Sequence, residues 1–139
     1  MRLWKVFRGI LLMAFFLLFC QVGRYVVVMQ SGTAGVCNDF GAFSLALPRW
    51  LLVFLAGAIV CALGVQWWRE QEGLPGEWAW LILMAGGMSN LWERVSTGCI
   101  EDYLDLPFLP AFNTADMMLT LGVIGIIWNL FLRHGRRQN

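Results

Sequence analysis

The chain has 139 residues, of which 59% are hydrophobic and only 14% are charged. Soluble domains carry about a quarter charged residues, so this composition argues against a water-soluble globule. The eight Trp and ten Phe residues argue against a disordered chain. The net charge of +1 provides no general attraction to nucleic acid, which is therefore not an expected partner. The length predicts a single domain over residues 1–139, and the long apolar runs predict a membrane protein.

Four apolar runs are candidates for membrane-spanning helices, because a hydrocarbon core needs about 20 apolar residues. In chain order they cover residues 10–29, 50–68, 78–92 and 117–132. The first run begins like a secretory signal peptide, with basic residues before an apolar stretch. However, Phe19 stands where a cleavage site would need a small residue, and the apolar run continues to Met29. We therefore expect an uncleaved first span and an all-α membrane protein with four transmembrane helices.

Most of the basic residues fall on one side of this arrangement. They precede the first span, lie between the second and third, or follow the fourth: Arg2, Lys5, Arg8, Arg69, Arg133, Arg136 and Arg137. Positively charged segments mark the cytoplasmic side of a membrane, so both termini are predicted to be cytoplasmic. The same side holds Glu70, Glu72 and Glu77, which we expect to face water.

The two outer segments cover residues 30–49 and 93–115. In the first of them, Phe40, Ala42, Ser44 and Leu45 could form short strands on the membrane surface, with turns at Gly32 and Gly35. This pattern predicts a small extracytoplasmic β-sheet between the first and second helices. Cys37 and Cys99 both fall on the outer side, where a disulfide between them could form in an oxidising compartment.

Acidic residues cluster in the outer segments and at their membrane edge: Asp39, Glu93, Glu101, Asp102, Asp105 and Asp116. Asp116 begins the fourth span, where a carboxylate could simply cap the helix. Asp102 alternates with apolar neighbours, as in a solvated strand or loop. A carboxylate at the membrane edge is nevertheless costly and often functional. Side by side, the two acids would share a proton, one acting as a base toward water and the other as an acid toward a peptide group.

Other chemistries lack the residues that they need. The only histidine is His134, in the basic C-terminal tail, and the four cysteines show no metal-binding spacing. No glycine-rich phosphate loop follows a strand. We therefore expect no metal and no other cofactor. A small ion-conducting or proton-conducting protein is an alternative, although its acids should line a path through the bilayer instead of gathering at one edge.

Three segments, in order, carry a resemblance to a known family. Residues 86–94 read Gly-Gly-Met-Ser-Asn-Leu-Trp-Glu-Arg, residues 101–105 read Glu-Asp-Tyr-Leu-Asp, and residues 112–116 read Phe-Asn-Thr-Ala-Asp. They resemble the Gly-rich Asn-Leu-x-Asp-Arg, Val-Val-Asp-Phe and Phe-Asn-x-Ala-Asp motifs of signal peptidase II, the lipoprotein signal peptidase family. A weaker similarity at residues 19–24 and 38–44 extends the resemblance over nearly the whole chain.

The resemblance implies an intramembrane aspartic endopeptidase of the bacterial cell inner membrane. Such an enzyme removes the signal peptide from a prolipoprotein just before a diacylglyceryl-modified cysteine, so the implied partners are these precursors and membrane lipid. The implied catalytic pair is Asp102 and Asp116. The residues implied to hold substrate backbone or to orient the carboxylates are Asn38, Asn90, Arg94 and Asn113.

Each supporting residue also has a purely structural explanation. Asn90 could join two helices, Arg94 could anchor the chain at the interface, Asn38 could form a turn and Asn113 could cap the fourth helix. The chain also departs from the family pattern at six positions. Cys20 and Glu93 each replace Asp, Arg24 replaces Lys, Phe40 and Ser89 each replace Gly, and Glu101 replaces an apolar residue. None of these changes removes the carboxylate pair, but they leave open an inactive relative that binds lipoprotein precursors without cutting them.

Overall fold

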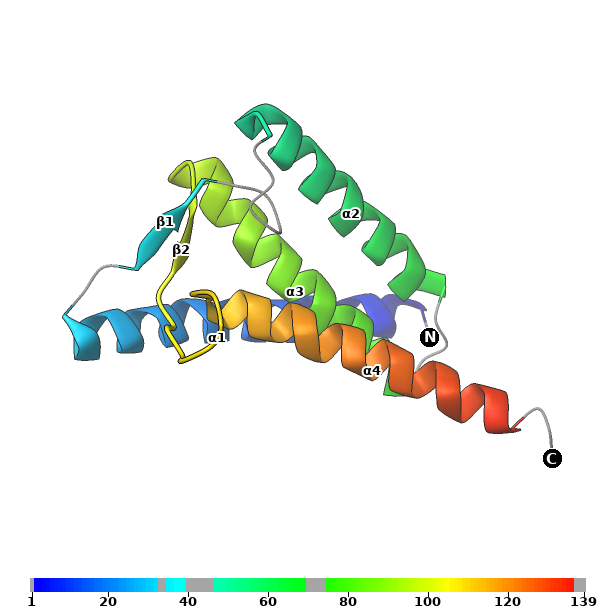
Figure 1. Ribbon diagram of the computed structural model, residues 1–139. Helices are drawn as coiled ribbons and strands as arrows, with labels where there is room; N and C mark the ends of the chain where they lie inside the picture. Colours follow the sequence, from blue (N-terminus) through cyan, green and yellow to red (C-terminus); the bar gives the residue numbers. More distant parts are fainter. Residues whose placement is uncertain (1, 33–34, 40–46, 70–74, 137–139) are drawn as a thin grey trace.

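The computed structural model describes residues 2–32, 35–39, 47–69 and 75–136. These residues are mostly helical, and each expected span falls within one long helix. The helices are α1 (Arg2–Ser31), α2 (Arg49–Arg69), α3 (Pro75–Ser96) and α4 (Thr114–Arg136). Two short strands, β1 (Val36–Asn38) and β2 (Ile100–Asp102), lie at the end of the bundle where α1 ends and α4 begins (Figure 1).

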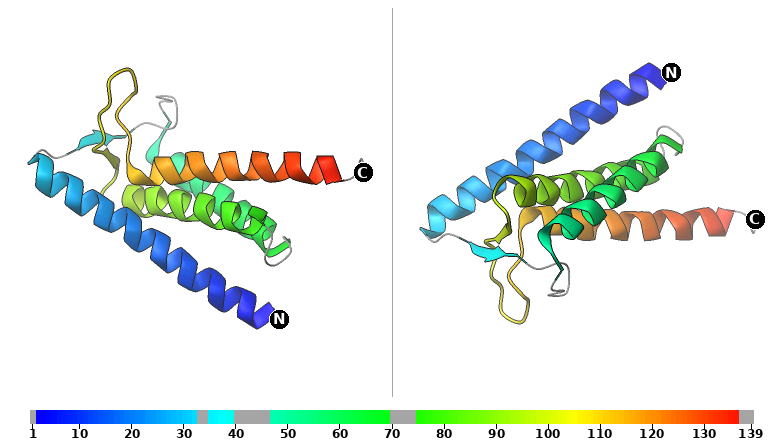
Figure 2. Two further views of the ribbon diagram at one scale, coloured as in Figure 1. Left: turned by 90° about the horizontal axis from the view of Figure 1, so that it is seen from below. Right: turned by 90° about the horizontal axis from the view of Figure 1, so that it is seen from above.

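Three helices are long and apolar enough to cross a membrane: α1 over Leu3–Gln30, α2 over its whole length and α4 over Thr114–Leu132. α3 has a shorter apolar part, because Glu77 lies in its first turn and Glu93 and Arg94 lie near its end. It packs against each of the other three helices and is the central element of the bundle (Figure 2). The chain is therefore a mostly helical membrane protein in which α3 contacts three helices that are each apolar enough to cross a membrane.

Small residues bring α3 and α4 into close contact. A Cβ added at Gly86 would lie 2.6 Å from the carbonyl oxygen of Ala115, and one added at Gly122 would lie 2.7 Å from the Cβ of Leu83. Helices in lipid associate through such close packing, because the surrounding lipid is as apolar as the helices themselves. Since Ala115 directly precedes Asp116, this packing also positions the first turn of α4 against α3.

A small buried cluster near the end of the bundle that carries the two strands joins α1 to the other helices. It consists of Cys20, Ala85, Ala115 and Met118, and the Cys20 thiol donates to Met118 Sδ at 3.1 Å. Cys20 stands where the family that the sequence resembles has a first-helix Asp. In this chain that position belongs to an apolar core.

The expectation that Glu77 faces water is wrong. Glu77 is only 1% exposed, and both of its carboxylate oxygens accept hydrogen bonds of 2.6 Å from Arg8 of α1. Lys5 donates to the carbonyl oxygens of Trp67 and Trp68 at 3.0 and 3.2 Å, at the end of α2. The basic residues of α1 thus neutralise a buried carboxylate and satisfy carbonyl groups that a helix end leaves without partners.

The sheet also differs from the expected one. β1 pairs in antiparallel fashion with β2, so that Cys37 faces Glu101, and the sheet joins the α1–α2 connection to the α3–α4 connection. Both connections leave the same end of the bundle, which lets each short strand satisfy its backbone groups with the other. The expected strand residues Phe40, Ala42, Ser44 and Leu45 lie outside the described residues. Gly32 makes the expected turn with a φ of 64°. Gly35 instead allows the two strands to approach closely, since a Cβ added at Gly35 would lie 2.8 Å from the backbone oxygen of Asp102.

We predict that Gly122→Ala lowers the free energy of unfolding by about 1–3 kcal/mol, because its methyl group overlaps the Leu83 backbone. Gly57→Ala is the matched control, since a Cβ added there meets no atom within 4 Å. Thermal unfolding of both variants in detergent micelles provides the comparison. Equal stability of the two variants would contradict the close α3–α4 packing.

Candidate active site

Asp102 is the last residue of β2 and is only 7% exposed. Its Oδ2 accepts a hydrogen bond from Asn38 Nδ2 at 2.9 Å, and its Oδ1 accepts one from Asn113 Nδ2 at 2.9 Å. Asn38 belongs to the opposite strand, and Asn113 directly precedes α4. Three segments that are distant in the sequence therefore converge on one buried carboxyl group.

Asp116 lies in the first turn of α4 and makes the helix cap that the sequence allowed. Its backbone N–H donates to Asn113 Oδ1 at 3.0 Å, and its Oδ2 accepts from the Asn113 N–H at 3.2 Å. This reciprocal pair is a capping box, which satisfies two of the free N–H groups at a helix start. The other oxygen, Oδ1, accepts from Asn90 Nδ2 of α3 at 2.8 Å. Asp116 thus stabilises α4 and also points a carboxyl group toward α3.

Asn113 connects the two acidic residues. Its side-chain nitrogen binds Asp102, while its side-chain oxygen and backbone N–H bind Asp116. Together with Asn38 and Asn90, it provides one amide donor to each of the four carboxylate oxygens. The two carboxyl groups are close enough for the charge of Asp116 to act on Asp102. The structure therefore brings together five of the six site residues that the sequence singled out.

Burial raises the pKa of the Asp102 carboxyl above its usual range, and the negative charge of Asp116 raises it further. The hydrogen bonds from Asn38 and Asn113 and the positive charge of Arg94 oppose this rise. The net shift is upward because removal from water penalises the charged form of a carboxyl group. Two carboxyl groups that share a site titrate as a pair, and the raised pKa of Asp102 favours one proton on this pair.

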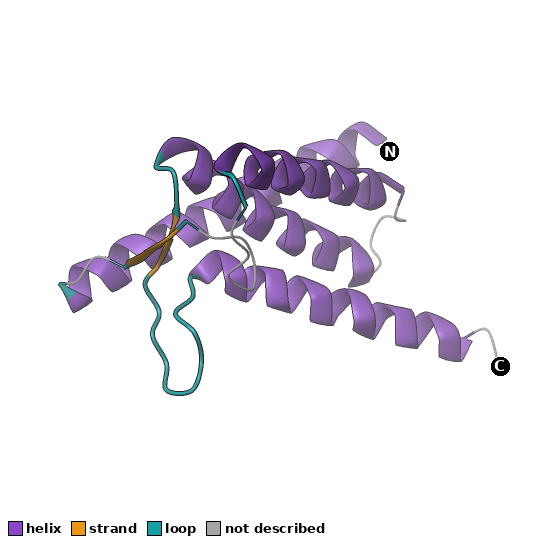
Figure 3. Cartoon of the chain, turned by 45° about the horizontal axis from the view of Figure 1, so that its top comes forward, coloured by secondary structure: helices purple, strands orange, loops and turns teal. Residues whose placement is uncertain are grey.

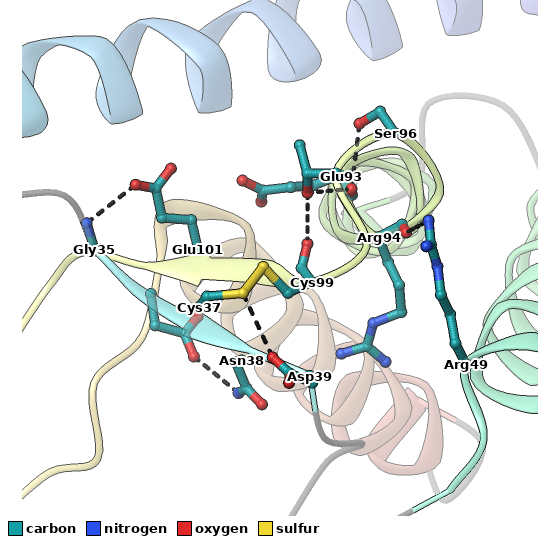
Figure 4. The surroundings of a disulfide bond; sticks show 12 residues. Gly35, Cys37, Asn38, Asp39, Arg49, Glu93, Arg94, Ser96, Cys99 and Glu101 are labelled. Carbon is teal, nitrogen blue, oxygen red and sulfur yellow. Dashed lines mark hydrogen bonds between the residues drawn. A yellow bond between two sulfur atoms is a disulfide. The ribbon is translucent and has the colours of Figure 1, made fainter.

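Arg94, the sixth residue, is buried near the end of α3. It lies within electrostatic reach of Asp102 and Asp39, and its guanidinium points toward the end of β1 (Figure 4). Its backbone carbonyl accepts a 3.0 Å hydrogen bond from Arg49, which lies beside it. Because an interfacial anchor extends into water, the burial of Arg94 favours a role within the site.

A disulfide joins Cys37 of β1 to Cys99, which lies just before β2 (Figure 4). The sequence allowed this disulfide but did not establish that it forms. Because Asn38 follows Cys37 and Asp102 lies shortly after Cys99, the bond holds the Asn38 strand against the Asp102 strand. Among the residues that the structure describes, one group has the spacing of metal ligands, and it comprises Cys37, Asp39 and Cys99. The disulfide occupies both of its sulfur atoms.

The sequence analysis missed an ion-pair network near the C-terminal end of α1. Arg24 Nε donates to Glu101 Oε2 at 2.8 Å, and its Nη2 contacts the same oxygen. Its Nη1 lies 3.5 Å from Glu93 Oε1, and the second oxygen of Glu101 accepts from the Gly35 N–H at 3.0 Å. All three charged residues depart from the family pattern, and they depart into partners for one another. Only the Glu101 replacement introduces a new charge, and this was the available signal, although Arg24 and Glu101 are 77 positions apart.

A second missed contact links the loop after Asp102 to α1. The Tyr103 hydroxyl lies 2.6 Å from Thr114 Oγ1, and this Thr114 hydroxyl also contacts the Cys20 carbonyl oxygen at 3.3 Å. Thr114 begins α4. Tyr103, which follows Asp102, and Thr114, which lies shortly before Asp116, therefore contact each other, and Thr114 also contacts α1.

An apolar groove of about 570 Å³ lies between α1 and α3. Its walls are mostly apolar, and its lining includes Leu17, Leu18, Gln21, Met88, Ser89 and Trp92. With so few polar groups it suits an acyl chain better than a peptide backbone. Ser89, a departure from the family pattern, is buried beside this groove and directly precedes Asn90.

The fold and the site together define a helical membrane protein with a hydrogen-bonded pair of carboxyl groups, one buried and one half-buried, at one end of its bundle. A family model described as signal peptidase (SPase) II matches residues 32–132. The chain therefore belongs to the signal peptidase II family.

Individual relatives and solved structures agree with this assignment. Lipoprotein signal peptidases are 39% identical over 56 residues in Moorella thermoacetica, 33% over 98 residues in Dehalococcoides mccartyi and 33% over 90 residues in Shewanella baltica. These alignments cover 40%, 66% and 60% of this chain, but only 37%, 61% and 52% of the respective relatives. A solved bacterial membrane enzyme is 27% identical with a TM-score of 0.78, covering 93% of this chain and 90% of that chain. A second one is 28% identical with a TM-score of 0.73, covering 88% and 92%.

We predict that Asn113→Ala lowers the free energy of unfolding by about 0.5–2 kcal/mol, because α4 loses its cap. Asn113→Ser should recover most of this loss, since a serine hydroxyl also caps a helix but does not extend to Asp102. Thermal unfolding in detergent micelles compares the two variants with the parental chain. If serine is no better than alanine, the lost stability comes from the Asp102 contact and not from the cap.

Proposed function

We propose that the chain is an aspartic endopeptidase that removes signal peptides from diacylglyceryl-modified prolipoproteins. The observation that carries this proposal is the set of amide donors from Asn38, Asn90 and Asn113, which holds Asp102 and Asp116 together in a buried place. Membership of the signal peptidase II family and the curated relatives named lipoprotein signal peptidase support the reaction and the substrate class.

In the proposed reaction, Asp102 carries the shared proton because burial raises its pKa. A water attacks the carbonyl carbon of the scissile peptide, Asp116 takes a proton from this water, and Asp102 donates its proton to the carbonyl oxygen. The resulting tetrahedral intermediate collapses as its C–N bond breaks. The leaving nitrogen receives the proton from Asp116, and Asp102 recovers its proton from the intermediate. The two carboxyl groups thereby return to their starting state without a metal or cofactor.

We further propose that all four helices span the bacterial inner membrane, with both termini in the cytoplasm and the site at the outer surface. The Cys37–Cys99 disulfide supports this orientation, because such bonds persist in oxidising compartments. The basic residues at the other end support it through the positive-inside rule. The central position of α3 supports a fourth span, since its charged residues lie at its two ends. The groove beside α1 is a candidate site for the acyl chains of the substrate.

We predict that Asp102→Asn and Asp116→Asn each lower the cleavage rate by at least about 10³-fold, because each removes an acid that transfers protons. Asp105→Asn should retain activity, since Asp105 is exposed in the same segment of the chain. A gel-shift assay with a lipidated precursor measures cleavage by purified protein in detergent, and thermal unfolding shows that each variant is folded.

The same assay separates the competing functions. An inactive relative would bind the lipidated precursor while the parental chain releases no signal peptide. An ion-conducting protein would release none and would carry protons or cations across vesicle membranes. Cleavage at the parental rate by either Asp variant would show that the carboxyl pair is not catalytic.

We predict that Asn38→Ala moves the alkaline limit of the pH–rate profile upward by roughly half to one pH unit, because Asn38 lowers the pKa of Asp102. Loss of this hydrogen bond raises that pKa, so Asp102 stays protonated to a higher pH. Val36→Ala, in the same strand and exposed, is the control that should leave the limit unchanged. Because the limit belongs to the carboxyl pair as a unit, a downward shift would contradict the assignment of the proton to Asp102.

A further inference from the structure

The segment between β2 and α4 forms a closed loop with an apolar tip. Leu104 and Phe112 pair across its base with backbone hydrogen bonds of 2.8 and 2.9 Å, and the Leu109 N–H donates to the Leu106 carbonyl at 3.2 Å. The loop protrudes from the rest of the chain (Figure 3). We call residues 106–110, which read Leu-Pro-Phe-Leu-Pro, the apolar tip.

The apolar tip is exposed although it is hydrophobic. Phe108 is fully exposed, and Leu106 and Leu109 are at least half exposed. No charged residue occurs between Asp105 and Asp116. Clusters of large apolar side chains that the chain leaves uncovered mark a surface that something else covers.

The backbone at Phe108 is also unfavourable for the residue that occupies it. Its φ of 74° lies in the left-handed region, and Phe108 is the only residue other than glycine with a positive φ among those that the structure describes. Glycine adopts this conformation without strain, whereas a bulky side chain does not. Neither the turn nor packing among the described residues therefore explains a phenylalanine here.

The position of the loop indicates what this contact is. The loop leaves the bundle sideways, across the helix axes, at the level where α4 begins (Figure 2). α1 and α4 are both apolar enough to span a membrane over this end of the bundle. An apolar tip that extends sideways at the start of a membrane helix meets the surface of the bilayer, where aromatic and aliphatic side chains partition favourably.

We infer that the apolar tip inserts into the lipid surface at the site end of the bundle, with Phe108 as its anchor. The partner is the boundary between lipid headgroups and acyl chains, and the contact requires no substrate. Since Asp102 lies at the base of the same loop, the anchor sets the depth of the carboxyl pair relative to the membrane surface. This inference goes beyond the proposed function and is tested without measuring cleavage.

The direct test measures the depth of a nitroxide label at the tip. Phe108→Cys is labelled in a Cys61→Ser background, which removes the exposed free cysteine, and is placed in phosphatidylethanolamine–phosphatidylglycerol vesicles. We expect the label to be more accessible to oxygen than to a water-soluble nickel chelate. A label at the exposed Asp105 is the aqueous control and should show the reverse. Equal accessibility of both labels to the nickel chelate would overturn the inference. Spin–spin broadening at position 108 that disappears on dilution with unlabelled protein would also overturn it, because such broadening indicates contact with a second copy of the chain.

A second test separates the ring from the turn. A label at Leu109→Cys reports tip depth with Phe108, with Phe108→Trp and with Phe108→Gly. Tryptophan keeps an interfacial aromatic ring and should preserve the depth. Glycine relieves the backbone strain but removes the ring, so the label should move toward water. An unchanged depth in the glycine variant would show that Phe108 does not anchor the tip.

Discussion

The structure depends on keeping two carboxyl groups together in a place largely removed from water. Burial raises the pKa of the Asp102 carboxyl, and the negative charge of Asp116 raises it further. The protein meets this constraint with amide groups: each of the four oxygens of Asp102 and Asp116 accepts a hydrogen bond from an asparagine. Amides donate without adding a charge, so the pair keeps a raised affinity for one proton. A lysine or arginine in direct contact would instead stabilise both carboxylates in their ionised form.

Asn113 links the cap of α4 to the arrangement of the carboxyl pair. One residue caps α4, orients Asp116 and binds Asp102. The structural and the functional explanations for Asp116 are therefore compatible, because the capping box uses one carboxylate oxygen and Asn90 binds the other. The close approach of α3 and α4 at Gly86 then places the Asn90 amide within reach of the first turn of α4.

The departures from the family pattern concentrate around the site without entering it. Arg24 and Glu101 form a direct ion pair that connects α1 to the sheet, with Glu93 nearby. Cys20 completes an apolar cluster between α1 and α4, and the Cys37–Cys99 disulfide closes the sheet. These contacts attach α1 and β1 to the rest of the bundle, while hydrogen bonds from three asparagines hold the two acids.

The sequence by itself determined the four helices and the candidate acids. Apolar run length is a local property that lipid selects directly, and the motif around Asn113 encodes a helix cap within four residues. Only the tertiary structure decided which segments of the chain lie beside one another. The burial of Glu77 against Arg8, the pairing of β1 with β2 and the Arg24–Glu101 contact all join segments more than 60 residues apart. Such contacts depend on how α1 and the strands pack against the other helices, which is a property of shape and not of any local sequence pattern.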